Sequence, residues 1–169
     1  MSLFVRIRRP ICIVLLLCVL LTLCFIFGNS MASREASGAA SDKINDIVSG
    51  VIESVTGKED TAVESFFVTY SRKIAHVIEF ALLGFEIFLL IYFLRLSGVS
   101  VHLSGLLLSF LVASVDEGIQ IVSGRGDLVS DIFIDASGYI GAYLVCALVF
   151  FLFSWRKKRK KRRTTDTVS

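Results

Sequence analysis

Four apolar stretches, each long enough to cross a lipid bilayer, constrain this chain more than any other feature of its sequence. An α-helix needs about 20 mostly apolar residues to cross roughly 30 Å of hydrocarbon. Three stretches reach that length, and the first lies at the short end of the accepted range. They are Ile11–Phe27, Ile74–Leu94, Val101–Val122 and Ile132–Phe153. The sequence therefore predicts an all-α, polytopic membrane bundle of about four transmembrane helices.

The composition agrees with a membrane protein. Hydrophobic residues make up 54% of the 169 residues, against about 45–50% in soluble domains, and the mean hydropathy is +0.74. All four cysteines fall inside apolar runs, and none has a metal-ligand spacing to a histidine. A cysteine inside an apolar run usually packs as a small hydrophobic side chain, so we predict neither a disulfide nor a cysteine metal site.

Positive charge indicates how the helices are oriented. Eight consecutive cations, Arg156–Arg163, follow the last apolar stretch. That position favours a cytoplasmic anchor beside anionic lipid over a nucleic-acid site. If both termini are cytoplasmic, twelve of the 18 Lys and Arg residues lie inside, as the positive-inside rule requires. We therefore expect a multi-pass protein of the bacterial cell membrane with both termini in the cytoplasm.

This topology divides the chain into four parts. We predict an N-terminal transmembrane helix, an extracytoplasmic segment, a three-helix membrane core and a cytoplasmic polybasic tail. The N-terminal stretch also has features of a signal peptide: a basic start and a candidate cleavage site, "SMA", at Ser30–Ala32. Its apolar core exceeds the ~7–15 residues usual for a signal peptide, so we favour a retained helix. The parts are residues 1–28, 29–70, 71–154 and 155–169.

The extracytoplasmic segment contains one helical pattern. Residues 41–56, "SDKINDIVSGVIESVT", place their apolar side chains three and four positions apart. This spacing predicts one apolar stripe on a helix, with Ser41 as its N-cap and Gly57 at its end. We expect an external amphipathic helix that lies on the outer membrane surface or against the bundle.

The apolar stretches also carry ionisable residues, and the topology places most of them near one membrane face. Charges that face lipid are costly, and those inside membrane segments usually mark functional sites. Residues spaced three or four apart share a helix face, so three polar faces are expected to meet in a cavity that opens outward. Its binding candidates are Arg72, Lys73, Asp116, Glu117, Gln120, Arg125, Asp131 and Asp135, and its candidates for proton transfer are His76 and Glu79.

Two further features bear on this cavity. Glu86 lies seven residues after Glu79, near the middle of its stretch, and either extends the cavity or is a structural buried acid. Gly138, Gly141 and Ala142 are small residues that allow neighbouring helices to approach closely.

Three kinds of chemistry fit these residues. His76 beside Glu79 suits general acid–base work, and the Arg and Lys residues suit a phosphate or carboxylate. Carboxylates with one imidazole also suit a cation, but the sequence has no recognised metal motif, so we predict no metal and no cofactor. The competing interpretation is an ion-pair network that only holds the helices together.

Three ordered motifs resemble the VanZ-like membrane family. They are "RKIAHVIEF" at Arg72–Phe80, "DEGIQ" at Asp116–Gln120 and "GRGDLVSDIFIDASG" at Gly124–Gly138. The resemblance covers roughly residues 71–153. The chain departs from the family pattern at Asp135, where Asn is frequent, and at Ser123, where proline is frequent.

The resemblance implies a small multi-pass bacterial protein, and the family's namesake is associated with reduced susceptibility to the glycopeptide teicoplanin. We expect a cell-envelope protein that binds or modifies an anionic lipid or a lipid-linked cell-wall precursor, whether or not it is an enzyme. The alternative is a non-catalytic membrane scaffold whose polar cluster only fixes helix packing. Membrane lipids are the expected partners, and nucleic acid is not.

Overall fold

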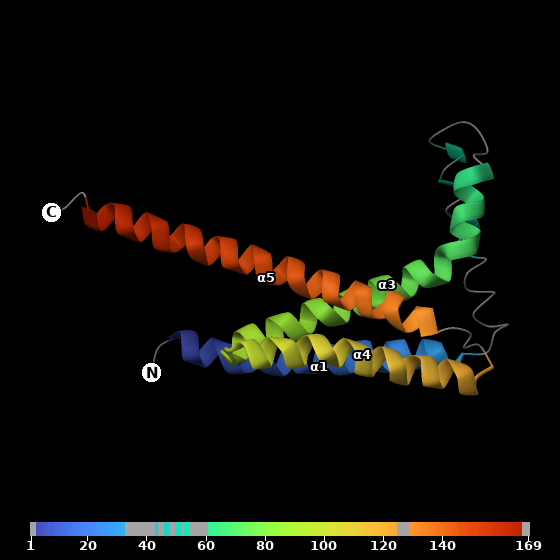
Figure 1. Cartoon of the computed structure of the whole chain (residues 1–169), viewed down its shortest axis with the longest axis horizontal. Helices are drawn as coiled ribbons and strands as arrows, with labels where there is room; N and C mark the ends of the chain where they lie inside the picture. Colours follow the sequence, from blue (N-terminus) through green and yellow to red (C-terminus); the bar gives the residue numbers. More distant parts are fainter. Residues whose placement is uncertain are drawn as a thin grey trace.

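The chain folds into long helices. The computed structural model describes residues 3–32, 61–124 and 129–166, together with positions 43, 46, 47, 50, 51, 53 and 54. Within these residues there is no strand, which confirms the predicted all-α class (Figure 1). The helices are α1 (Leu3–Met31), α3 (Thr61–Leu94), α4 (Val99–Val122) and α5 (Val129–Asp166).

Each of these helices contains a segment long and apolar enough to cross a membrane. Large apolar side chains point outward from the bundle, for example Leu21, Leu107 and Phe151, each more than 60% exposed. Such exposure is costly in water but suits contact with lipid tails. The prediction of about four transmembrane helices is therefore confirmed, with segments Arg8–Met31, Lys73–Leu94, Val99–Val122 and Val129–Lys157.

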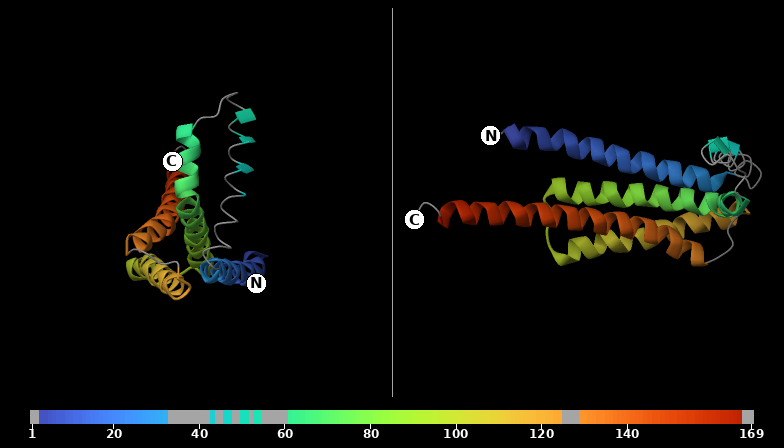
Figure 2. Two further views of the ribbon diagram at one scale, coloured as in Figure 1. Left: turned by 90° about the vertical axis from the view of Figure 1, so that its right-hand side faces the viewer. Right: turned by 90° about the horizontal axis from the view of Figure 1, so that it is seen from above.

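The four helices alternate in direction, so both termini lie at one end of the bundle (Figures 1 and 2). The α3 helix packs most extensively against α5, and α1 lies against α3 and α4. The first turns of α3 bend away from the rest of that helix (Figure 1). The end opposite the termini, which we call the distal end, gathers the last turns of α1 and α4 and the first turns of α5.

Two glycines allow α3 and α5 to pack backbone against backbone. A Cβ atom on Gly84 would collide with the main chain of Tyr139, and one on Gly138 with the main chain of Val77. Glycine is thus required at both contacts, because a backbone carbonyl cannot rotate away as a side chain can. Gly138 confirms the predicted close approach, whereas Gly84 was not predicted.

The same expectation is wrong for Gly141. This glycine is exposed, and a Cβ atom there would meet nothing within 4 Å. Three residues advance a helix by about 300°, which leaves Gly141 about 60° away from Gly138 around α5. That rotation is enough to take Gly141 off the face that contacts α3.

Two buried tyrosines tie α5 to α4. The Tyr139 hydroxyl donates a hydrogen bond of 2.6 Å to the Gly105 carbonyl oxygen. The Tyr143 hydroxyl lies 2.8 Å from His102 Nδ1, and the ring of Tyr143 packs edge-on against Phe88 of α3. Polar groups in a low-dielectric interior need such partners, so these contacts help to specify how the helices pair.

The predicted amphipathic helix over residues 41–56 lies largely outside the described residues. Its described positions are helical and exposed. Two of them, Ile47 and Val51, belong to the predicted apolar stripe and are 66% and 56% exposed. At these two positions the stripe is not buried, and the location of the helix, on the membrane surface or against the bundle, stays a prediction.

Candidate functional site

Ionisable side chains from three helices meet near the distal end. His76 of α3, Asp116 of α4 and Asp135 of α5 each place a nitrogen or oxygen atom within 4.8 Å of the other two. Asp116 is fully buried and Asp135 is 4% exposed. The convergence expected from helix spacing and topology is thus present for these three residues, although their functional roles stay predictions.

Hydrogen bonds from two helices hold the Asp116 carboxylate in place. Ser30 Oγ of α1 donates to Oδ1 over 2.5 Å, and Gln120 Nε2, one turn along α4, donates to Oδ2 over 2.7 Å. The His76 Nδ1 atom lies 3.8 Å from Oδ2. We call Ser30, His76, Asp116, Gln120 and Asp135 the polar centre.

Asp135 is held differently from Asp116. Among the described residues it has no hydrogen-bond or ion-pair partner, although its side chain is buried. Among the described residues, the carboxylates of Asp116, Asp131 and Glu117 act on it unfavourably, and the Lys73 ammonium acts on it favourably. Burying like charges together is unfavourable unless a proton or a cation compensates them.

Two carboxylates of α3 receive hydrogen bonds from α1. Asn29 Nδ2 donates to Glu79 Oε1 over 2.9 Å, and Thr22 Oγ1 donates to Glu86 Oε1 over 3.1 Å. Thr22 and Asn29 are seven residues apart, as are Glu79 and Glu86, so one antiparallel register satisfies both pairs. Glu86 is 7% exposed, which gives this residue a structural partner inside the bundle.

Sequence reasoning missed these α1 residues. It placed Asn29 and Ser30 in the extracytoplasmic segment, but α1 continues to Met31. The signal that was available is the seven-residue interval between Thr22 and Asn29, two turns apart on one face of an otherwise apolar stretch. That interval matches the interval between the two glutamates of α3.

Of the three predicted cationic residues of the site, only Lys73 has a described side chain. Its Nζ atom lies 2.8 Å from Asp131 Oδ1, and the two side chains are 43% and 27% exposed. The side chain of Arg72 and the whole of Arg125 lie outside the described residues. Glu117, the remaining predicted binding residue, is 5% exposed on α4.

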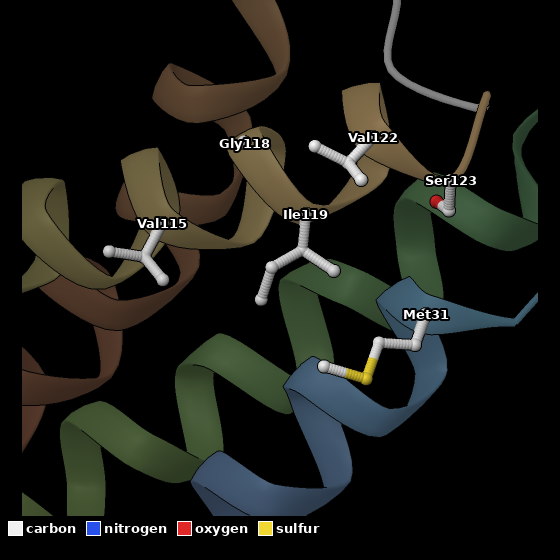
Figure 3. Close-up of a pocket in the computed structure, with 6 residues that line it drawn as sticks. All are labelled: Met31, Val115, Gly118, Ile119, Val122 and Ser123. Atoms are coloured by element: carbon white, nitrogen blue, oxygen red, sulfur yellow. The ribbon is translucent and has the colours of Figure 1, made fainter.

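An apolar groove lies beside the polar centre, between the ends of α1 and α4 (Figure 3). Its volume is about 500 Å³. Ser123 lines it and donates a hydrogen bond of 2.9 Å to the Ser30 carbonyl oxygen, and Ser30 in turn bonds Asp116. The groove therefore adjoins the polar centre through one residue. Its lining is Met31, Val115, Gly118, Ile119, Val122 and Ser123.

The arrangement permits two kinds of chemistry. An imidazole beside a carboxylate can exchange a proton with a bound group. An imidazole with two carboxylates can also ligate a cation. Because the residues of the polar centre are packed between helices, a polar group that reaches them is removed from water, and its electrostatic interactions are strengthened.

Comparison with known protein families gives a match. The sequence profile of the family described as VanZ/LLP1 matches residues 12–162, which includes α1 from Cys12 onward as well as the three later spans. The match is wider than the three motifs near residues 71–153. Neither the curated proteins nor the solved structures give a significant match to this chain.

Proposed function

This chain belongs to the VanZ/LLP1 family, and from that membership and the geometry of the polar centre we propose that it engages a lipid of the bacterial cell envelope. The ligand is a membrane lipid or a lipid-linked cell-wall precursor with an anionic head group. Its head group binds at the distal end of the bundle. The excess of cations near the termini supports an orientation in which that end faces outside the cell. The chain of the ligand lies along the groove between α1 and α4.

The observation that carries this proposal is the position of the polar centre beside an apolar groove. Asp116 and Asp135 are buried within membrane-spanning helices, and intramembrane ionisable residues usually serve function. An amphipathic ligand needs a polar site and an apolar one next to each other. The groove and the polar centre, joined through Ser123 and Ser30, provide that pair.

Lys73 is the described cation best placed for the head group. It stays 43% exposed while it bridges to Asp131, so a phosphate or carboxylate can approach it from the distal surface. A lysine ammonium binds phosphate as a point charge. Arg72 and Arg125 are proposed to join it on the evidence of sequence alone.

The test is native mass spectrometry of the full-length protein purified in mild detergent. Wild type is expected to carry an anionic lipid, and Lys73→Met with Arg125→Ala is expected to lose it. Arg9→Ala is the control, because it removes an exposed cation at the opposite end of the bundle. Absence of bound lipid from wild type, or equal retention by all variants, would contradict the proposal.

The competing function is a scaffold in which the polar centre only fixes helix packing. It is favoured by the hydrogen bonds that Asp116 and Glu79 already accept from α1 and α4. His76→Ala and Gln120→Ala separate the two functions. Loss of lipid binding with nearly unchanged melting temperature supports the ligand site, whereas unfolding of both variants supports the scaffold.

Family membership also suggests a phenotype. We propose that expression of this chain lowers the susceptibility of a bacterial host to teicoplanin. The measurement is the inhibitory concentration for cells expressing wild type or His76→Ala at equal membrane levels. An unchanged concentration for wild type would remove teicoplanin from the proposal and leave lipid binding to the mass spectrometry.

A second contact with lipid is proposed at the end that carries the termini. A cavity of about 610 Å³ there is lined by three aromatic side chains, Tyr92, Phe150 and Phe153, and by Ser154, Arg156 and Lys157. Basic residues beside a membrane span attract anionic lipid at about 1 kcal/mol each. Trp155 contributes an interfacial aromatic ring, over which Arg159 lies at 4.2 Å.

A further inference from the structure

We propose that His76, Asp116 and Asp135 bind one divalent transition-metal cation between α3, α4 and α5. One donor atom from each residue lies within 4.8 Å of the other two. The three donors come from three different helices, so the site exists only in the folded bundle. A cation there would link helices that approach one another near the distal end.

Charge balance is compatible with a divalent cation at this position. Asp116 and Asp135 are both buried, and two ionised carboxylates beside a neutral imidazole carry two negative charges. Protonating His76 removes one of these charges, whereas a divalent cation removes both and leaves the imidazole neutral, as a ligand must be.

Asp135 gives a second, independent indication. Its carboxylate is 4% exposed and has no hydrogen-bond or ion-pair partner among the described residues. The carboxylate lies close to two other potential ligands, His76 and Asp116. A bound cation would give it a direct partner.

The surroundings of Asp116 match those of a metal ligand. Ser30 and Gln120 donate to its two oxygens over 2.5 and 2.7 Å. Ligating carboxylates are commonly oriented by such hydrogen bonds. In a tetrahedral shell with ligands at ~2.1 Å, the donor atoms lie roughly 3.4 Å apart. The three donor atoms here lie within 4.8 Å of one another. Binding therefore requires each donor–donor distance to shorten by at most about 1.4 Å.

The donor set selects the kind of ion. One imidazole with two carboxylates suits Zn²⁺ or Mn²⁺ better than Mg²⁺ or Ca²⁺, which prefer oxygen ligands throughout. Three protein ligands leave a coordination position open. A phosphate oxygen in that position would explain how an acidic centre serves an anionic head group, but cation binding itself does not depend on the proposed lipid function.

The test uses the full-length chain without a histidine tag, stripped with EDTA in detergent and then titrated with Zn²⁺ or Mn²⁺ without added lipid. Calorimetry and elemental analysis are expected to show about one ion per chain. Asp135→Asn keeps the shape of the side chain and should weaken binding more than 100-fold. Gln120→Ala, which removes a positioning residue, should weaken it about 10–100-fold.

Glu86→Gln is the matched control, because it neutralises a buried carboxylate outside the three-residue set. It should bind the ion as wild type does, and the ion should raise the melting temperature of wild type and Glu86→Gln but not of Asp135→Asn. The proposal fails if wild type binds neither ion, or if Asp135→Asn and Glu86→Gln bind equally. If Asp135→Asn does not fold, wild-type stoichiometry and the affinity of Gln120→Ala decide the question.

Discussion

Adding one methyl group at Gly138 should disrupt a backbone-to-backbone contact between α3 and α5. In Gly138→Ala the new Cβ would lie closer than 3.0 Å to the Val77 backbone of α3. A helix carbonyl cannot move alone, so α3 and α5 must separate along their interface, the most extensive in the molecule. Overpacking of this kind typically costs about 1–3 kcal/mol.

Gly141→Ala isolates that steric cost. Gly141 lies on the same helix three residues later, and its added methyl group meets nothing within 4 Å. Both substitutions gain the same helix propensity, up to ~1 kcal/mol, so the propensity cancels when the two variants are compared. The expected difference is therefore the steric cost alone, a factor of roughly 5–150 in the folding equilibrium.

The assay is reversible unfolding by SDS in mixed micelles, followed by circular dichroism. Gly138→Ala should unfold at a lower SDS fraction than wild type, and Gly141→Ala at the same fraction or a higher one. Gly84→Ala should resemble Gly138→Ala, and the double variant should lose less than the sum, because helices that have separated already accommodate the second methyl group. Free energies for Gly138→Ala and Gly141→Ala within about 0.5 kcal/mol of each other would refute the reasoning.

Three further predictions concern other contacts. Tyr139→Phe removes the hydroxyl that bonds Gly105 and should cost about 1–3 kcal/mol in the same SDS assay, because the carbonyl loses a buried partner; an unchanged unfolding curve would contradict this role. Ser30→Ala removes a donor to Asp116 and should also destabilise by about 1–3 kcal/mol, and wild-type stability would show that α1 does not support the polar centre. Replacing the cations of residues 156–163 with glutamine should reduce binding of the purified protein to vesicles containing anionic lipid, with neutral vesicles as the control, and equal binding to both vesicle types would reject the tail as a lipid contact.

The sequence by itself determined the class of the protein and much of its plan. Four long apolar stretches predict a bundle of transmembrane helices, because a backbone in hydrocarbon must satisfy its own hydrogen bonds. The polar residues of the later spans could also be placed at one end, because helix direction alternates at each crossing. That reasoning predicts that His76, Asp116 and Asp135 lie close together.

The tertiary structure decided which of these groups touch and which helix supports them. Sequence spacing shows which residues share one face of a helix. It does not show how that helix is rotated or shifted against its neighbours. Gly138 and Gly141 illustrate this limit, since a rotation of about 60° separates a required glycine from an exposed one. The contribution of α1, through Asn29 and Ser30, likewise depends on its register against α3 and α4. The candidate metal site has no sequence motif for the same reason: its three donors are distant in the chain and meet only when three helices pack.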